Sequence, residues 1–475
     1  MRVLLFAALV LAATAAPAQL QAQLSADTTA KIDAAANKIL AETGVPSASL
    51  GIVAEGKIVY AHAYGLARVS PPLPATPDLA YPIGSISKQF TSTAVLLLQE
   101  QGKLSIDDPV AKYFPELTRA ADVKLRNLMT MTSGYEDFAP QDYSIPLWYQ
   151  PREPIVTVRE WAGKPLDFEP GTQWQYSNTN YVLLALIVEK VTGEPFYKYL
   201  REHVLDAAHL SGAFVAYADR DKLKTTGYVS YAMQPPRVLP LEASGWYFGD
   251  GELAMPAATL LKWDLTFIDQ SILTPASYKQ METPFILKDS KTGKPDAGKD
   301  TNYGLGIFVR ERNGHRMIEH GGEVGGYVAE NVVYPEDKMA IVVLTNEVAS
   351  DAASGIAAAV HALLVPSAAA PASAPDSLAA QMPAILAGFA KGEIDRSLFT
   401  SNCNSYFSKD ALADFKATLA PLGAVTSVKR TRTSLRGGMT FGLWSVTFAG
   451  GTTLTMDTYT LPDGKIEQFL ILSKA

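Results

Sequence analysis

Apolar residues near the start of the chain change from helical spacing to strand-like runs. Ile32, Ala36, Ile39 and Leu40 recur at helical intervals, and Asp27 is the expected N-cap. The runs 48–54 and 57–65 are rich in β-forming residues and flank the turn Glu55-Gly56. The pattern predicts a helix followed by a hairpin that begins an antiparallel sheet.

The middle of the chain has a helical pattern, and strand patterns return after it. Residues 105–269 show mostly helical periodicity with long loops, and the apolar run 181–191 predicts a buried helix ending at Gly193. Strands are predicted at 303–309, 326–334 and 339–346, with a closing helix at 356–364. This order favours an α+β fold in which an antiparallel sheet is flanked by helices and covered by an all-helical subdomain.

Composition divides the chain into four parts. Residues 1–23 combine Met1-Arg2, an apolar run and small residues, which is typical of a signal peptide. Residues 365–375 contain mainly Ala, Ser and Pro and read as a linker. We therefore expect a main domain at 24–364 and a small α+β accessory domain at 376–475, with two helices before four strands, serving packing or ligand binding rather than chemistry.

Charge and cysteine content restrict the partners and the compartment. The 475 residues carry a net charge of -7, which argues against nucleic acid or an anionic membrane as the partner. Cys403 is the only cysteine, so no intramolecular disulfide can form. With the signal peptide, these features predict a bacterial periplasmic or secreted protein without a membrane span in its mature form.

The first candidate for chemistry is the segment 84–90, which contains Ser85 and Lys88. On a helix, residues three apart share a face, so the lysine amine and the serine hydroxyl would point into the same space. An amine in that position can activate a serine nucleophile. The alternative for an isolated Ser-x-x-Lys is a surface pair on an amphipathic helix, but no other serine in the chain has a lysine three residues on.

The second candidate is Tyr176-Ser177-Asn178, which follows a Pro-Gly turn. Tyr176 could accept the serine proton and return it to the leaving group, with Lys88 favouring the phenolate. Asn178 is expected to supply amide donors to Lys88 or to a substrate carbonyl. The segment can also be interpreted as an ordinary polar turn.

Two segments compete to form the strand edge that lines the cleft. Lys291-Thr292-Gly293 lies in a polar loop without strand periodicity, and a loop does not hold an oxyanion donor rigidly. His320-Gly321-Gly322 lies between two predicted strands, 316–319 and 325–334, where small residues let a substrate approach the backbone. We assign the role to this second segment, with the backbone N–H groups of Ser85 and Glu323 as the oxyanion hole.

Together these motifs resemble those of the serine β-lactamase and penicillin-binding-protein superfamily. Over roughly residues 30–365 the chain is similar, more narrowly, to the class C β-lactamase-related family, which includes esterases, D-amino-acid peptidases and D-alanyl-D-alanine carboxypeptidases. The resemblance implies that Ser85 is the acyl-enzyme nucleophile, Lys88 its partner and Tyr176 the general base, with Asn178 in the cleft. Further matching segments are 105–110, 128–134, 168–171 and 303–306.

One departure from the family pattern affects the expected substrate. The family's lysine before the third glycine motif is His320 here, and a histidine is mostly neutral near pH 7. We therefore expect a serine hydrolase acting on an ester or on an amide or peptide bond, without metal or cofactor. The alternatives are a β-lactamase or D-Ala-D-Ala carboxypeptidase, and a non-catalytic sensor of cell-wall fragments.

Overall fold

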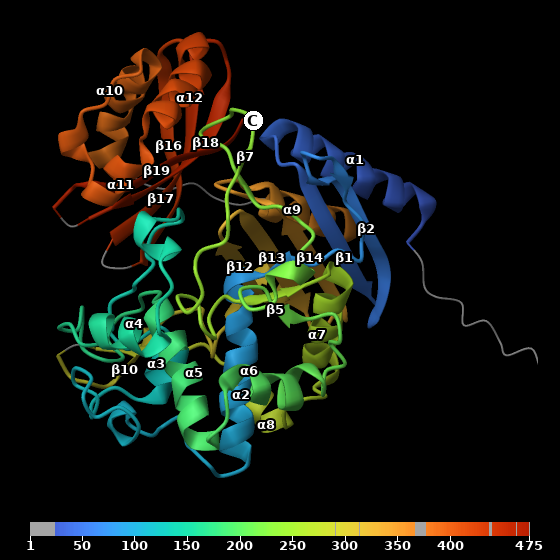
Figure 1. Ribbon diagram of the computed structural model, residues 1–475, viewed down its shortest axis with the longest axis vertical. Coiled ribbons are helices and arrows are strands. Elements are labelled where there is room, and N and C mark those ends of the chain that lie inside the picture. The colour runs from blue at the N-terminus through green and yellow to red at the C-terminus, as the bar shows by residue number, and fades with distance from the viewer. Residues whose placement is uncertain are drawn as a thin grey trace, which may run out of the picture.

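The computed structural model describes residues 24–289, 291–312, 314–365, 377–436, 439–461 and 463–474 (Figure 1). The expected signal peptide lies outside these residues, as does the expected linker apart from Val365. Among the helices of the described ranges, none has the length and apolar character needed to cross a membrane.

A seven-stranded sheet forms the centre of the main body, with strand order β11-β12-β13-β14-β1-β2-β3. The inner strand β1 (Ser47–Ala54) is antiparallel to its chain neighbour β2 (Lys57–Arg68) and to β14 (Met339–Thr345) from the far end of this body. The sheet therefore closes only when both ends of the main body meet. Its other strands are β3 (Leu73–Pro74), β11 (Phe308–Arg312), β12 (His315–Val324) and β13 (Tyr327–Tyr334).

The inner strands of this sheet are buried on both sides, because helices cover both of its faces. The helices α1 (Ala26–Thr43) and α9 (Ala352–Leu364) share one core with β1 and β14. On the opposite face lie α2 (Ser87–Glu100) and α7 (Ala257–Asp269) (Figure 1). The expected α+β class, an antiparallel sheet flanked by helices, is confirmed.

The segment between α2 and α7 forms the helical layer that covers the sheet. Its central helix α5 is buried and ends, as expected, at Gly193, which takes a left-handed φ of 72°. This layer is not all-helical as expected, because it also contains short strands, and β4 (Tyr81–Pro82) pairs with one of them, β8. The remaining elements are α3 (Leu125–Met129), α4 (Pro154–Trp161), α5 (Asn178–Thr192), α6 (Phe196–Leu200), β5 (Phe214–Val215), β6 (Tyr228–Val229), β7 (Arg237–Val238) and β8 (Leu253–Met255). After α7 come α8 (Pro275–Met281) and, before α9, the short strand β15 (Glu347–Val348).

Three local predictions were wrong. The N-cap of α1 is Ser25, whose hydroxyl accepts from the Thr28 amide, and not Asp27, which lies in the first turn. The strand predicted at 303–309 begins only at Phe308, because Gly306 has a φ of 84° that interrupts extended backbone. The segment His320-Gly321-Gly322 lies inside β12 rather than between two strands.

The Lys291-Thr292-Gly293 segment lies in the turn between two short strands, β9 (Ile286–Lys288) and β10 (Pro295–Asp300). The sequence pattern showed no strand here, so the hairpin was missed. The three residues are exposed on its tip. They do not line the cavity that contains Ser85.

The chain after residue 376 has its own core and its own four-stranded antiparallel sheet, in the order β16-β17-β18-β19. The predicted helices and strands are present, and α11 was not foreseen. This sheet contacts the main body: Gln468 and Asp142 are hydrogen-bonded to each other, and the Ser473 hydroxyl donates to Asp351. Figure 1 shows the C-terminal unit beside the main body. The elements are α10 (Ser377–Lys391), α11 (Ser401–Tyr406), α12 (Lys409–Leu419), β16 (Val425–Arg436), β17 (Met439–Phe448), β18 (Thr453–Thr460) and β19 (Ile466–Lys474).

Candidate active site

Ser85 is presented by a single 3-10 turn, Gly84–Ile86, placed directly before α2. Gly84 has a φ of 51°, and a Cβ atom there would lie 2.5 Å from the Glu323 amide nitrogen on β12. A side chain at this position would therefore push the turn and the strand apart. The glycine lets the backbone of Ser85 pack directly on β12.

Lys88 lies on the first turn of α2 and is buried, with its Nζ surrounded by oxygen atoms. Nζ donates to Ser85 Oγ at 2.9 Å and to Asn178 Oδ1 at 2.8 Å. It also lies 3.2 Å from the carbonyl oxygen and 3.3 Å from Oδ2 of Asp250. All four neighbouring atoms are hydrogen-bond acceptors, which suits a lysine side chain with up to three N–H donors and holds Lys88 against the serine hydroxyl.

Asp250 is the counterion of Lys88, and the sequence analysis did not find it. The side chains of Lys88 and Asp250 are 0% and 1% exposed. Burial raises the pKa of Asp250 to about 7, against the opposing effect of Lys88. Its Oδ1 has no hydrogen-bond partner among the described residues. The available signal was an acidic residue between Gly249 and Gly251, a few residues before the apolar run 253–255.

Asn178 is the first residue of α5, and its side chain is fixed on both sides. Its amide nitrogen Nδ2 donates to Asp137 Oδ1 at 3.1 Å and to the Ala139 carbonyl at 3.2 Å. The amide oxygen therefore faces Lys88. The expectation that Asn178 would donate to Lys88 was wrong, because an ammonium has no acceptor. Asp137 was also missed by the sequence analysis.

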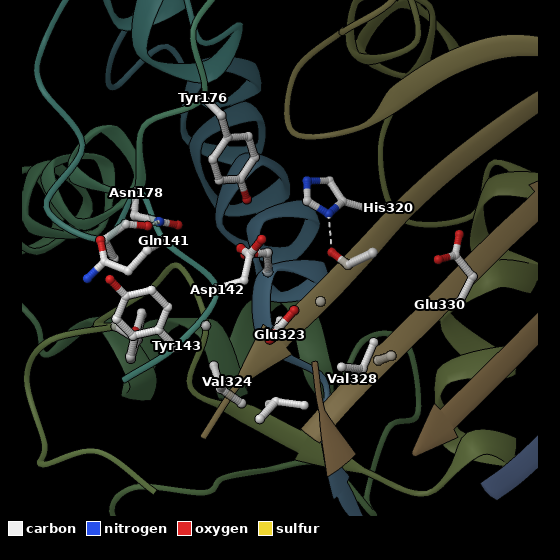
Figure 2. A pocket seen from close by; sticks show the side chains of 18 of the residues that line it. Gln141, Asp142, Tyr143, Tyr176, Asn178, His320, Glu323, Val324, Val328 and Glu330 are labelled. Atoms are coloured by element: carbon white, nitrogen blue, oxygen red, sulfur yellow. Dashed lines mark hydrogen bonds between the residues drawn. The ribbon is translucent and has the colours of Figure 1, made fainter. Parts of the chain in front are cut away.

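Tyr176 lies two residues before α5, beside Lys88. The Lys88 Nζ is 5.0 Å from the centroid of the Tyr176 ring, within the range of a cation–π contact. The ring centroids of Tyr176 and His320 are 6.2 Å apart. Figure 2 shows the tyrosine hydroxyl pointing into the space between Asn178 and His320.

His320 is buried on β12 and held in one tautomer. Its Nδ1 lies 2.6 Å from the Gly321 carbonyl oxygen, drawn as a dashed line in Figure 2, so Nδ1 carries the proton. Nε2 then accepts from the Tyr303 hydroxyl at 3.1 Å. Burial, reinforced by the charge of Lys88, lowers the pKa of His320 to about 3. The imidazole is therefore neutral at any ordinary working pH.

Gly322 and Glu323 bring β12 against the serine turn. A Cβ atom on Gly322 would lie 1.9 Å from the Ile83 carbonyl oxygen and 3.1 Å from the Ser85 amide nitrogen. With the Gly84 contact to the Glu323 amide, this places the backbone amides of Ser85 and Glu323 at one junction. The pairing of β11 with β12 ends at Glu319, so the segment from His320 to Glu323 has an open edge beside the serine.

A cavity of about 530 Å³ opens over this junction. Ser85, Tyr176, Asn178, His320 and the segment Gly321–Glu323 all line it, whereas Lys88 lies beneath. Of the aromatic run at 246–248, only Tyr247 reaches the cavity. Among the described residues, no group of three or more His, Cys, Asp or Glu side chains is arranged to hold a metal ion. The structure thus brings all the predicted site residues together.

A fold with these features defines a class, the serine hydrolase fold shared by β-lactamases and penicillin-binding proteins. The family model described as Beta-lactamase matches residues 32–364, and the chain belongs to this family. Among curated relatives, a putative penicillin-binding protein PbpX of Bacillus subtilis is 28% identical over 54% of this chain and 61% of its own. Penicillin-binding protein 4* of the same bacterium is 26% identical over 62% of this chain and 66% of its own length. The chain thus spans less than two thirds of the length of these relatives.

Solved structures agree on the fold. A penicillin-binding protein homologue from Pyrococcus abyssi, described as octameric, has a TM-score of 0.61 and 22% identity, covering 93% of this chain and 99% of its own. A D-stereospecific amidohydrolase from Streptomyces has a TM-score of 0.59 and 23% identity, covering 71% and 99%. EstCE1, a hydrolase with promiscuous acyltransferase activity, has a TM-score of 0.58 and 20% identity, covering 71% and 98%.

Proposed function

We propose that this protein is a serine hydrolase that forms an acyl-enzyme at Ser85 on a small ester or on an amide or peptide of a D-amino acid. The observation that carries the proposal is the 2.9 Å contact between Lys88 Nζ and Ser85 Oγ at the floor of the cavity. Ser85 is half-buried and lies open to a substrate, while Lys88 is held in place by Asn178 and Asp250.

In the first step, Ser85 Oγ attacks the substrate carbonyl and loses its proton to Tyr176. The Lys88 charge stabilises the negative charge that Tyr176 carries as a base. The backbone N–H groups of Ser85 and Glu323 would stabilise the oxyanion. Tyr176 then protonates the leaving alcohol or amine, and water releases the acyl group by the reverse sequence.

His320 favours neutral substrates close to the serine. A lysine in its place would supply a permanent cation for a carboxylate, as in penicillins and D-alanyl peptides, whereas His320 is neutral and already hydrogen-bonded to Tyr303. The similarity in fold to a D-stereospecific amidohydrolase and to the hydrolase EstCE1 is compatible with this substrate class. A β-lactamase or D-Ala-D-Ala carboxypeptidase is the second candidate, favoured by the penicillin-binding relatives.

The experiment is intact mass spectrometry of the protein after exposure to a fluorophosphonate, a p-nitrophenyl ester, D-phenylalanine amide, a penicillin and a D-alanyl-D-alanine peptide. Ser85→Ala and the neighbouring Ser87→Ala serve as the paired variants. Adducts or turnover with the phosphonate, ester and amide, lost only in Ser85→Ala, support the proposal. A penicillin adduct supports the second candidate, and no adduct with any probe indicates a non-catalytic binding protein.

We also propose that the protein is exported through residues 1–23. Relatives such as PbpX come from bacteria. Fractionation of a bacterial host that expresses the full chain, with N-terminal sequencing of the product, tests this. A product that keeps residue 1 in the cytoplasmic fraction contradicts it.

A further inference from the structure

The cavity beside Ser85 continues past the proposed catalytic groups and around the edge of β12. His320 pairs with Asn331 on β13, and Asn331 donates to Asp264 on α7, so both side chains lie on the α7 face of the sheet. Gly321 pairs with the next residue, Glu330, on the opposite face. Since His320 and Glu330 both line the cavity, it extends from one face to the other.

Two features of β12 make this passage possible. The pairing of β12 with β11 ends at Glu319, so among the described residues no strand is paired with Gly321 along that edge. Gly321 also has no side chain, and a Cβ atom there would lie 3.7 Å from Glu330 Oε2. Figure 2 shows Glu330 on the far side of this strand from Tyr176 and Asn178.

The C-terminal unit supplies part of the wall at the far end. Arg432 and Thr433 on β16 and Tyr459 on β18 line the same cavity as Ser85. Ser354 on α9 and Arg310 on β11 line it from the main body. A substrate that extends over β12 would therefore meet residues more than three hundred positions away from the serine in the sequence.

The charges at this end do not cancel. Arg310 forms an ion pair with Glu319, so these two charges are matched. The Arg432 side chain is exposed and makes no hydrogen bond or ion pair with any described residue. Burial and the nearby Glu319 raise the pKa of Glu330 to about 8, against the opposing effects of Arg312, Arg310 and Arg432, so this carboxyl is mostly neutral at pH 7. One arginine remains without a counter-charge, beside a carboxyl group that can donate a hydrogen bond.

We propose that this far end is an anion subsite, in which Arg432 of the C-terminal unit binds a carboxylate at the end of the substrate distant from the cleaved bond. The inference rests on the proposed hydrolysis at Ser85 and adds a substrate class to it. Preferred substrates are esters or amides whose acyl chain is long enough to cross Gly321 and ends in a carboxylate. The cation missing at His320 is thus supplied at a greater distance from the scissile bond.

The test uses the full-length protein and mono-p-nitrophenyl esters of adipic and sebacic acid, each compared with its methyl-capped neutral form. A charge-assisted hydrogen bond predicts that kcat/KM for the long acid exceeds that of its capped form by about tenfold, mostly through KM. The short acid should show no such preference. Arg432→Gln should abolish the preference and leave p-nitrophenyl acetate hydrolysis unchanged, and Arg432→Lys should keep part of it.

Lys429→Gln is the matched control, because Lys429 is an exposed cation on the same strand that does not line the cavity. If Arg432→Gln and Lys429→Gln weaken the preference for the long acid equally, the effect comes from the loss of one positive charge at any position on the strand, which would overturn the subsite. Acetate turnover without any carboxylate preference in the wild-type protein would overturn the subsite and leave the hydrolase proposal standing. If no ester is hydrolysed, or Ser85→Ala is as active as the wild type, the hydrolase proposal fails and the subsite fails with it.

Discussion

Adding one methyl group at Gly322 tests whether the oxyanion hole lies where β12 meets the serine turn. The new Cβ would lie 1.9 Å from the Ile83 carbonyl oxygen, whereas real Cβ atoms essentially never approach other atoms closer than 3.0 Å. The obstacle is backbone, which cannot rotate away as a side chain can. The strand and the turn must therefore separate by about 1 Å, an amount that misaligns catalytic groups enough to reduce rates by about 10²-fold.

The size of the loss follows from the geometry of the oxyanion. Donors act only within about 2.7–3.1 Å of the oxyanion, so moving the Glu323 amide away removes one donor and lowers kcat by about 10²–10³-fold. The strain itself costs about 1–3 kcal/mol of the free energy of unfolding. We expect Gly322→Ala to fold with a lowered melting temperature and to show nearly unchanged KM for p-nitrophenyl acetate.

The matched control adds the same methyl group one residue earlier on the same strand. At Gly321 the nearest atoms to a Cβ are 3.7 Å away, an ordinary contact distance, so Gly321→Ala should keep kcat for this small ester within about threefold. The assay is steady-state hydrolysis with thermal unfolding followed by circular dichroism. If folded Gly322→Ala has the same kcat as Gly321→Ala, the oxyanion is not stabilised at this junction.

The other predictions concern proton transfer and pH. Tyr176→Phe should lower kcat for the ester by about 10²–10⁴-fold, while a normal rate would exclude Tyr176 as the base. The pKa of Asp250 is raised to about 7, and its ionised form holds Lys88, so wild-type kcat/KM should decrease as the pH is lowered through about 7. Asp250→Asn should remove this decrease on the acid side of the pH profile. A variant profile identical to that of the wild type would contradict the role of Asp250 as the counterion. Folding lowers the pKa of His320 from 6.5 to about 3. Between pH 6.5 and pH 3 the histidine therefore binds a proton only in the unfolded chain, and the free energy of unfolding decreases as the pH falls. Between pH 7 and pH 4 this costs ~3 kcal/mol, which urea unfolding should show for the wild type and not for His320→Gln.

Local spacing was sufficient to predict the part of the site that lies on single elements. Ser85 and Lys88 are three residues apart, and Tyr176 and Asn178 are two apart at the start of α5, so the sequence itself fixes their proximity. Asp250 reaches Lys88 across 162 residues, through a loop whose path no local pattern specifies. For that reason the counterion appears only in the three-dimensional structure.

The fold shows the same division between local and long-range information. Strands with clear apolar patterns, such as β1 and β14, were found, although nothing in the sequence indicated that they are neighbours. The error at 303–309 came from Gly306, whose left-handed backbone interrupts an otherwise strand-like run. The wall formed by Arg432 could not be foreseen, because it depends on how two separate cores pack together.

Because β1 pairs with β14 from the far end of the main body, the sheet can form only late in the synthesis of the chain. The Ser47 amide donates to Asn346 Oδ1, 299 residues later, so one edge of β1 has no partner until nearly the whole main body has been synthesised. Contacts this distant along the chain slow folding and leave an apolar strand edge open to aggregation in the meantime. Activity should therefore appear late in biosynthesis, and chains that end before β14 should be captured by chaperones or degraded rather than accumulate as partly active enzyme.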